Sequence, residues 1–485
     1  MTAAGALPPV RKVGRGPTLA YGFGAVAYGV KDNGFGTFLL LFYNQVVGLP
    51  SATVGLVIMA ALIFDAFIDP AVGVLSDRTR SRWGRRHPWM YSAALPIAAG
   101  WLLLWNPPSL SEPLTLVWLF ATAVAVRTAV SCYEVPSQAL TPELSADYDE
   151  RTRITSYRYL FGWAGGLTAL FAAYAIFLTP ETPGGNGLLN RPGYSHFALA
   201  TAIAMAVAII VSALGTHGEI RHLPKQAAPT GSVGAAFREL LETVKNRAFV
   251  ILMLAGLCVY TNQGISFSLS NYLYSFVWRF SGGDFTWLAL VLFAGVCVSF
   301  GIAPPVARRI GKPRAAAIFA ACSAVLLTLP YWLRFAGLFP EPGSPILLPA
   351  LFGIFIFHTG CSVSAMILGA SMMADVVEHS EAHTGRRSEG VFFAGGFFIQ
   401  KCTSGVGIAI SGLVLWAANF PAAATPGEVP VPVIDRLTLI YCVIYLCVGL
   451  LGAWLYSRFP FGRDEHMSRV EAMGGSAGEA SMPIR

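Results

Sequence analysis

Charged residues are scarce in this sequence. Only 12% of its 485 residues are Asp, Glu, Lys or Arg, whereas 55% are hydrophobic. A water-soluble protein has about twice that charged fraction. The composition therefore excludes a soluble protein of this length and indicates that lipid solvates much of the surface. The net charge of +7 could suggest nucleic-acid binding, but the placement of the basic residues argues against it.

The sequence also lacks the motifs of common enzymes and of metal or redox sites. It has no HExxH motif and no Walker loop. None of its eight cysteines forms a CxxC pair, and all lie in apolar runs, where cysteine packs as a small hydrophobic residue. We expect no enzymatic activity and no cofactor. The N-terminal residues lack the compact apolar core of a signal peptide.

The sequence contains many long apolar runs. A membrane-spanning helix needs about 20 mostly apolar residues, and twelve stretches meet this requirement. They are roughly 20–46, 51–75, 88–106, 113–140, 155–179, 196–216, 248–278, 285–306, 313–335, 345–376, 390–418 and 437–458. The sequence therefore predicts an all-α membrane protein with twelve transmembrane helices.

The basic residues predict the orientation of these helices. Lys and Arg concentrate in the two tails and in every second loop, whereas the alternate loops hold only Arg191, Arg279, Arg334 and Arg436. Loops rich in Lys and Arg face the cytoplasm, so both termini are predicted to be cytoplasmic. This asymmetry explains the positive net charge without nucleic acid.

The apolar pattern is interrupted at its midpoint. Residues 217–247 begin as a polar linker and continue as VGAAFRELLETVKNR, whose spacing predicts an amphipathic helix on the inner face. We therefore divide the chain into two six-helix halves, 1–216 and 248–460, joined by this linker. The polar tail 461–485 is expected to be disordered.

Seven charged residues lie deep within the predicted helices. A charge at the bilayer centre costs at least ~2.5–3.5 kcal/mol, so this set indicates a hydrated, internally paired site; ion pairs that only hold helices together are the alternative. The formal charges sum to −1, which one monovalent cation would neutralise. The residues are Lys31, Asp32, Asp65, Asp69, Arg127, Glu134 and Lys401.

Two of these residues are spaced as a cation site. Asp65 and Asp69 are four residues apart, so both project from one face of a helix. Two carboxylates held together in a low dielectric repel each other and need a cation or a proton between them. The pair therefore predicts a cation-coupling site, which would hold sodium or a proton.

Several segments resemble the glycoside–pentoside–hexuronide:cation symporters of the major facilitator superfamily. They are DAFIDPAVGVLSDRTRSRWGRRHPWM, YGFGAVAYGVKDNGFG, YEVPSQALTPELSADYDERTRITSYR, MMADVVEH and GGFFIQKCTSG. The resemblance covers all twelve helices. It implies the two-half major facilitator fold and cation-coupled symport of a sugar, glycoside or uronide across a cell membrane, in the simplest case a bacterial inner membrane. We expect a monomer whose partners are the solute and the bilayer.

The resemblance also implies a coupling site. Asp65 and Asp69 match the family's cation ligands, Ser131 supplies a nearby hydroxyl, and Lys401 faces the pair. The family's third oxygen ligand on helix 2 corresponds here to Ile68, which offers no oxygen. The resemblance therefore favours sodium, whereas the chemistry of Ile68 favours a proton.

The solute site matches the family in part. The acidic residue on helix 4 corresponds to Glu134, the stacking tryptophan to Gln138, and the arginine on helix 5 to Arg158. The acidic residue on helix 1 aligns with Gly29, and Asp32 can replace it one turn deeper. The expected solute-binding residues are Lys31, Asp32, Arg127, Glu134, Gln138 and Arg158, whose cations also suit a carboxylated sugar.

The loop after helix 2 carries either simple topology charges or a gate latch. Asp77 can cap a helix start and pair with arginines near the inner end of helix 4 or 11. The latch residues are Asp77, Arg78, Arg82, Arg85 and Arg86, and the acidic partners are Glu143, Asp147, Asp149, Glu150, Asp375, Glu378 and Glu381. Such pairs would close the inner side in the outward-facing state.

Two alternatives remain open at this point. Helix 7 carries Tyr260, Asn262, Gln263, Ser266 and Ser270, which either line the cavity or bond to neighbouring helices. Sodium-dependent lysophospholipid transporters resemble the sequence more distantly. A lysolipid transporter would need an apolar lateral cleft, which the phenylalanines of helix 11 permit. A receptor without transport would leave the buried charges unexplained.

Overall fold

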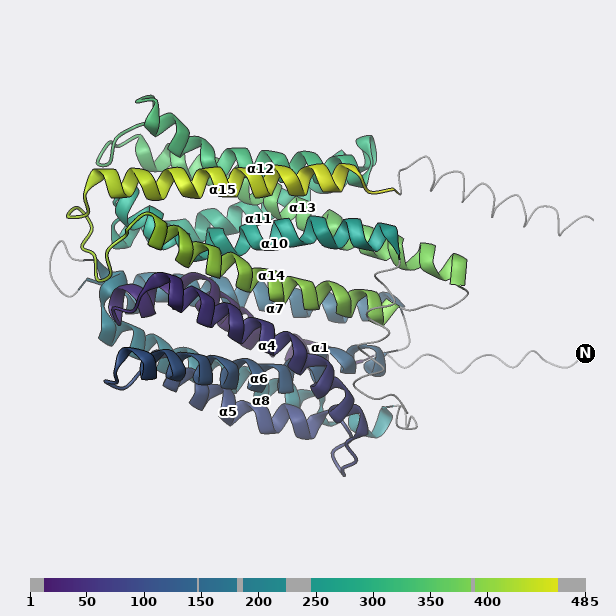
Figure 1. The fold of residues 1–485 in the computed structure, drawn as a ribbon. Coiled ribbons are helices and arrows are strands. Elements are labelled where there is room, and N and C mark those ends of the chain that lie inside the picture. The colour runs from purple at the N-terminus through teal and green to yellow at the C-terminus, as the bar shows by residue number, and fades with distance from the viewer. Residues whose placement is uncertain (1–12, 146–147, 181–185, 224–245, 385–388, 461–485) are drawn as a thin grey trace, which may run out of the picture.

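The computed structural model is a bundle of helices that run roughly along one axis (Figure 1). It describes residues 13–145, 148–180, 186–223, 246–384 and 389–460. Within these ranges the regular structure is helical, with no strand. Ten of the described helices are long and apolar enough to cross a membrane.

Among the described residues, the N-terminal half contains eight α-helices and several short helical segments. Its elements are α1 (Arg15–Phe23), α2 (Val26–Asn33), η1 (Gly34–Phe38), α3 (Leu39–Leu41), η2 (Phe42–Val46), α4 (Ser51–Arg78), α5 (His87–Trp105), α6 (Glu112–Leu144), α7 (Tyr148–Ala172), η3 (Ala173–Phe177), η4 (Gly187–Leu189), α8 (Arg191–His217) and η5 (Ile220–His222).

The C-terminal half is built from longer, less interrupted helices. Its elements are α10 (Arg247–Tyr272), η6 (Leu273–Val277), α11 (Gly282–Ile310), α12 (Lys312–Phe335), α13 (Leu347–Thr384), α14 (Glu389–Ala417) and α15 (Val431–Ser457).

The ten apolar helices correspond to all of the predicted spans except 20–46 and 88–106. The first of these is divided into short segments, α1 to η2. The second is α5, with the sequence HPWMYSAALPIAAGWLLLW. Its proline, tyrosine and tryptophan residues lower its mean hydropathy below that of the ten apolar helices. The count of twelve spans therefore remains a prediction.

The first predicted helix is broken because it passes very close to its neighbours. A Cβ atom at Gly24 would overlap the hydroxyl of Tyr133 on α6 and the side chain of Ser212 on α8. Only glycine leaves room for this approach. The chain turns at Gly24 and starts again as α2, which carries the first of the predicted site residues.

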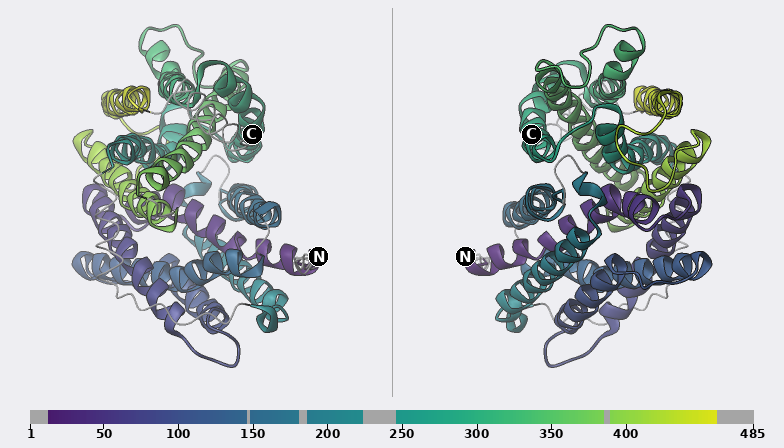
Figure 2. Two further views of the ribbon diagram at one scale, coloured as in Figure 1. Left: turned by 90° about the vertical axis from the view of Figure 1, so that its right-hand side faces the viewer. Right: turned by 90° about the vertical axis from the view of Figure 1, so that its left-hand side faces the viewer.

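The two halves are separate bundles that meet along a seam. Seen along the helix axes, the purple and blue helices lie on one side together with the teal α8, and the later teal to yellow helices lie on the other (Figure 2). Helices α4 and α14 lie side by side at the seam (Figure 1), where Gly55 packs on Ala409 and Gly412. Small residues let helix backbones approach closely in membranes.

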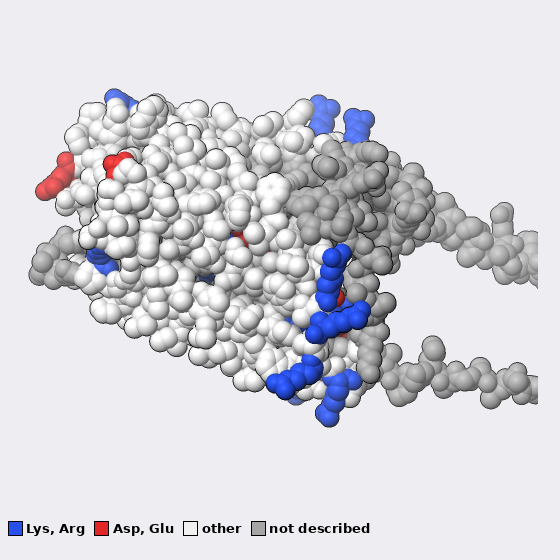
Figure 3. Space-filling view, turned by 60° about the horizontal axis from the view of Figure 1, so that its bottom comes forward, with Lys and Arg blue, Asp and Glu red and all other residues white. Residues whose placement is uncertain are grey.

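The surface has a broad band almost free of charge. Figure 3 shows one face on which most of the visible Lys and Arg lie toward one end, and the middle shows very little charge. Large hydrophobic side chains such as Leu95, Phe300 and Trp416 are exposed. A surface of this kind fits a lipid environment.

Two predicted features fall outside the described residues. They are most of the predicted amphipathic helix of the linker, because residues 224–245 are not described, and the polar tail 461–485. Of the polar first part of the linker, the structure describes residues 217–223, which include η5.

Candidate cation and solute site

Helices α4 and α6 hold the first part of the site. Asp65 and Asp69 face α6, where Arg127 and Ser131 stand at the same four-residue spacing. Arg127 donates to Asp65 Oδ2 from Nε at 2.9 Å and from Nη2 at 2.8 Å. Asp65 is only 2% exposed, and a charge so deeply buried needs compensation of this kind.

Lys401 joins this pair from the other half of the molecule. Its Nζ atom lies 2.5 Å from Asp69 Oδ2 and 2.9 Å from Asp65 Oδ2. Lys401 therefore lies beside both carboxylates, as predicted. Because Lys401 belongs to α14, the contact bridges the seam between the halves.

Ser131 bridges the other two carboxylate oxygens. Its Oγ atom lies 2.9 Å from Asp65 Oδ1 and 2.6 Å from Asp69 Oδ1. A serine hydroxyl has one proton to donate, so it satisfies only one of these oxygens at a time. One of the two carboxylate oxygens is therefore left without the Ser131 proton at any moment.

A second charged group surrounds Glu134. Arg158 Nη2 lies 2.5 Å from Glu134 Oε1, and Gln138 donates to the same oxygen at 2.9 Å. Arg158 also donates to Ser137 Oγ at 2.7 Å and to Tyr21 Oη at 3.3 Å. Glu134 Oε2 is buried without a hydrogen-bond partner among the described residues, so this carboxylate has a free acceptor.

Sequence reasoning missed two members of this group, Tyr21 and Ser137. Ser137 lies three residues after Glu134 on α6, so helical spacing could have indicated it. Nothing in the sequence marks Tyr21, because its contact with α6 and α7 depends on how α1 packs.

Lys31 and Asp32 lie side by side on α2 but differ in environment. Lys31 is 3% exposed, and its Nζ atom lies 3.6 Å from Asp32 Oδ1 and 4.3 Å from the centre of the Tyr28 ring. The Asp32 side chain is 48% exposed. Lys31 is thus the least compensated cation of the site.

The packing of α2 on α7 explains why the family's helix 1 acid is missing at position 29. A Cβ at Gly29 would overlap the carbonyl oxygen of Gly162 on α7. No side chain fits there, so position 29 cannot carry the acid, and Asp32 is the acid that α2 presents to solvent.

The structure corrects the predicted charge balance. The sum of −1 omitted Arg158, which the structure buries against Glu134. The completed set has four acids and four cations and is neutral. It consists of Lys31, Asp32, Asp65, Asp69, Arg127, Glu134, Arg158 and Lys401. A coupling ion therefore does not fill a charge deficit in this conformation.

The predicted latch forms within the N-terminal half. Arg86 pairs with Asp77 of its own loop and, at 3.1 Å, with Glu143 of α6, and Arg85 lies 2.7 Å from Glu143. In this conformation Asp77 pairs with Arg86, and its pairing with arginines near the inner end of helix 4 or 11 in the outward-facing state stays a prediction. The loop folds back on itself and brings Arg86 closer.

The remaining latch residues have other surroundings. Arg82 is exposed and lies over the ring of Trp83 at 5.3 Å, and Arg78 is exposed in the last turn of α4. Glu150 accepts from the backbone N–H of Val13 at 2.8 Å, and Asp375 pairs with Lys312 at 2.6 Å. The side chains of Asp147, Asp149, Glu378 and Glu381 lie outside the described residues.

Helix α10 uses one of its polar residues for helix packing. Asn262 donates to the backbone oxygen of Tyr445 on α15 at 2.9 Å. It is buried against that helix, so it bonds neighbouring helices instead of lining a solute site.

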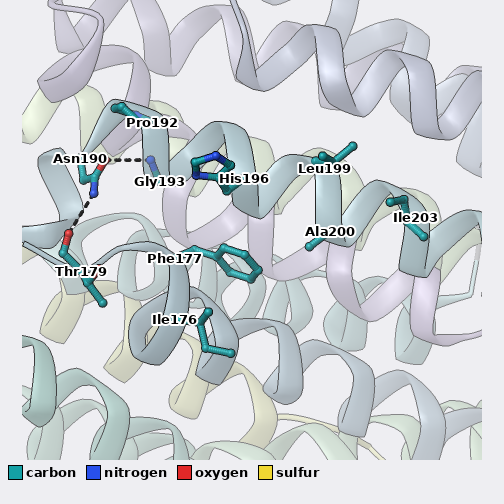
Figure 4. Close-up of a pocket in the computed structure, with 10 residues that line it drawn as sticks. All are labelled: Ile176, Phe177, Thr179, Asn190, Pro192, Gly193, His196, Leu199, Ala200 and Ile203. Carbon is teal, nitrogen blue, oxygen red and sulfur yellow. Dashed lines mark hydrogen bonds between the residues drawn. The ribbon is translucent and has the colours of Figure 1, made fainter.

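A pocket of about 670 Å³ lies elsewhere, between the end of α7 and the start of α8 (Figure 4). Ile176, Phe177, His196 and Leu199 are among its lining residues. None of the predicted site residues lines it. Among the described residues, no group of three or more His, Cys, Asp or Glu side chains could hold a metal ion.

Comparison with known proteins gives one consistent result. The model of the family described as MFS/sugar transport protein matches residues 20–463. The chain is 26% identical to an isoprimeverose transporter from Lactiplantibacillus pentosus, over 80% of this chain and 77% of the relative. It is 24% identical to the sodium-dependent lysophosphatidylcholine symporter 1-A of Danio rerio, over 92% and 86%.

Solved structures support the fold. A crystal structure of a D-xylose–proton symporter is similar with a TM-score of 0.64, covering 91% of this chain and 97% of that one at 13% identity. At this identity the likeness shows the fold alone. The observed architecture is thus the major facilitator fold, as predicted.

Proposed function

The chain belongs to the MFS/sugar transport protein family, and from this membership we propose that it is a cation-coupled symporter of a sugar, glycoside or uronide. It works by alternating access across a bacterial inner membrane. Its twelve spans place both termini in the cytoplasm. The family consists of transporters, which agrees with the absence of enzyme motifs.

One observation carries the proposal. Lys401 of the C-terminal half contacts both carboxylates of α4 in the N-terminal half, at 2.5 and 2.9 Å. Secondary transporters bind solute and ion between their halves. An ion that displaces Lys401, or a proton that neutralises one carboxylate, changes the attraction between the halves. Ion binding is thereby linked to their relative motion.

The oxygen geometry favours a proton as the coupling ion. The described residues offer three oxygens on the side away from Lys401: Asp65 Oδ1, Asp69 Oδ1 and Ser131 Oγ. A proton on Asp69 lets this carboxyl donate to Ser131, which then donates to Asp65. Sodium needs several oxygen ligands, and Ile68 removes one of those that the family uses.

The unsatisfied groups favour a hydroxylated, carboxylated solute. Glu134 Oε2 has no hydrogen-bond partner within the described part of the chain, and Asp32 is half exposed. Carboxylates accept hydrogen bonds from sugar hydroxyls. Among the described residues, the ion pair of Lys31 is the 3.6 Å contact with Asp32. Its ammonium can pair with a solute carboxylate, so a uronide satisfies more of this site than a neutral sugar.

The conformation is closed at the end opposite the termini. There, Tyr174 donates to Asn271 at 2.7 Å and Tyr272 donates to Asn44 at 2.9 Å, each across the seam. At the end with the termini, each of the ion pairs described above joins two residues of the same half. With cytoplasmic termini, the structure is closed to the outside.

Uptake into proteoliposomes tests the proposal. The purified protein is offered labelled glycosides, uronides and lysolipids under a pH gradient without sodium, or a sodium gradient without a pH gradient. We expect uptake of a glycoside or uronide that a protonophore collapses. Uptake that follows sodium alone overturns proton coupling. Preference for lysolipid overturns the sugar assignment in favour of the alternative of the same fold.

A further inference from the structure

Position 138 lacks the aromatic ring that the resemblance places there. Gln138 is exposed, and its amide donates to Glu134 Oε1 at 2.9 Å. An amide offers no broad apolar face for the C–H side of a sugar ring, as an aromatic residue does. If the solute is cyclic, another residue near Glu134 has to supply this surface.

Tyr28 stands in the right place on α2. It lies four residues before Asp32, so both side chains project from one face of the helix. Both are partly exposed, whereas the three residues between them are buried. This face of α2 therefore presents a ring and a carboxylate together to solvent.

The neighbours of Tyr28 belong to the solute site. The ammonium of Lys31 lies 4.3 Å from the ring centre, a cation–π contact that orients the ring and covers one of its faces. Lys31 in turn lies 3.6 Å from Asp32 Oδ1, so the ring, the ammonium and the carboxylate form one cluster on α2. Helix α2 also packs against α6, which carries Glu134.

We propose that Tyr28 is the aromatic platform of the solute site. The C–H face of a sugar ring packs on Tyr28, while Asp32 and Glu134 accept hydrogen bonds from its hydroxyls. The inference rests on the proposed sugar-transport function and adds its main specificity: a cyclic solute is preferred over an acyclic one.

Binding of matched ligands to the full-length protein tests this role. The probes are the methyl glycoside or methyl glucuronide that the wild type binds most tightly, and an alditol with the same number of hydroxyls. We expect Tyr28→Phe to bind the ring within about threefold of the wild type. Tyr28→Leu should lose about tenfold, the effect of ~1.4 kcal/mol, with unchanged alditol binding.

A ratio of ring to alditol affinity distinguishes a platform from a structural role. A structural defect lowers both affinities, whereas loss of the platform removes only the preference for the ring. Gln138→Trp in the Tyr28→Leu background should restore part of the preference. Tyr91→Leu removes a ring outside the site and serves as the matched control, with an unchanged ratio.

Two results overturn the platform. One is a Tyr28→Leu protein that keeps the wild-type preference; the other is an equal loss for both probes. If Tyr28→Leu does not fold, Tyr28→Met fills similar space without a ring and is judged by the same ratio. Failure of the wild type to transport any glycoside or uronide refutes the proposed function instead, so the two failures are distinguishable.

Discussion

The two carboxylates of α4 differ as single residues, although they share one helix face. Asp65 is 2% exposed and is contacted by Arg127, Lys401 and Ser131. The Asp69 side chain is 26% exposed, and among the described residues its polar partners are Lys401 and Ser131. Under the proposed function, Asp65 is the permanent anion, and Asp69 is the carboxylate that exchanges a proton or an ion.

The first prediction concerns Ile68. Ile68→Asn returns an oxygen ligand to α4 beside Asp65 and Asp69, and sodium binds where several oxygens converge. We expect solute uptake to become sodium-dependent, with at least a severalfold stimulation by a sodium gradient. Ile68→Leu, which adds no oxygen, is the control and should behave as the wild type. Equal sodium responses in both variants would contradict the assignment of this position to the ion site.

The second prediction concerns the buried pair of Arg127 and Asp65. Arg127→Met leaves the carboxylate with fewer partners, and breaking a buried pair costs ~3–5 kcal/mol. Thermal unfolding in detergent should show a marked loss of stability, partly restored by adding Asp65→Asn. Arg334→Met breaks the more exposed pair with Asp435, worth ~0–1 kcal/mol. Similar losses for both arginine variants would argue against buried pairing.

At the scale of elements, glycine contacts determine where the helices lie. Gly29 of α2 meets Gly162 and Gly166 of α7, and Gly407 of α14 meets Gly264 of α10. Backbones that approach this closely fix the rotation of each helix. The rotation of α2 turns Tyr28 and Asp32 toward solvent and leaves no room at position 29.

The third prediction tests the α2–α7 contact. Gly29→Ala introduces a methyl group where the Gly162 carbonyl already lies, so α2 has to move away. We expect less folded protein by gel filtration and weaker solute binding. Gly301→Ala on α11 is the control, because nothing lies within 4 Å of its Cβ position and alanine favours a helix by about 1 kcal/mol. Normal yield and binding for Gly29→Ala would show that this packing is not required.

At the scale of the whole molecule, the seam combines a closed end with a charged centre. Hydrogen bonds of Tyr174, Tyr272 and Gln45 join the halves at the end opposite the termini. Lys401 joins them at the charged group. Opening that end requires breaking the hydrogen bonds, so their strength sets the balance between conformations.

The fourth prediction weakens this closed end. Tyr174→Phe and Tyr272→Phe together remove two hydrogen bonds, each worth about 1 kcal/mol. The balance should shift toward the open form by about thirtyfold. Distances between spin labels at Ser109 and Glu341, measured by double electron–electron resonance, should show a larger population of long distances. Tyr91→Phe, away from the seam, should leave the distance distribution unchanged. If this control shifted the distribution and the double variant did not, the hydrogen bonds of Tyr174 and Tyr272 would not be what holds this end closed.

The sequence by itself determined the membrane fold, the two halves and the charged residues that matter, because lipid makes buried charge expensive and leaves a pattern in one dimension. It also indicated the partnership of Asp65, Asp69 and Lys401 through the resemblance. Only the tertiary structure decided that Arg158 neutralises Glu134, that Arg86 pairs with Asp77, and that Lys31 lies between the Tyr28 ring and Asp32. These outcomes depend on how the chain turns between helices and on how each helix is rotated, which the local spacing within one helix does not encode.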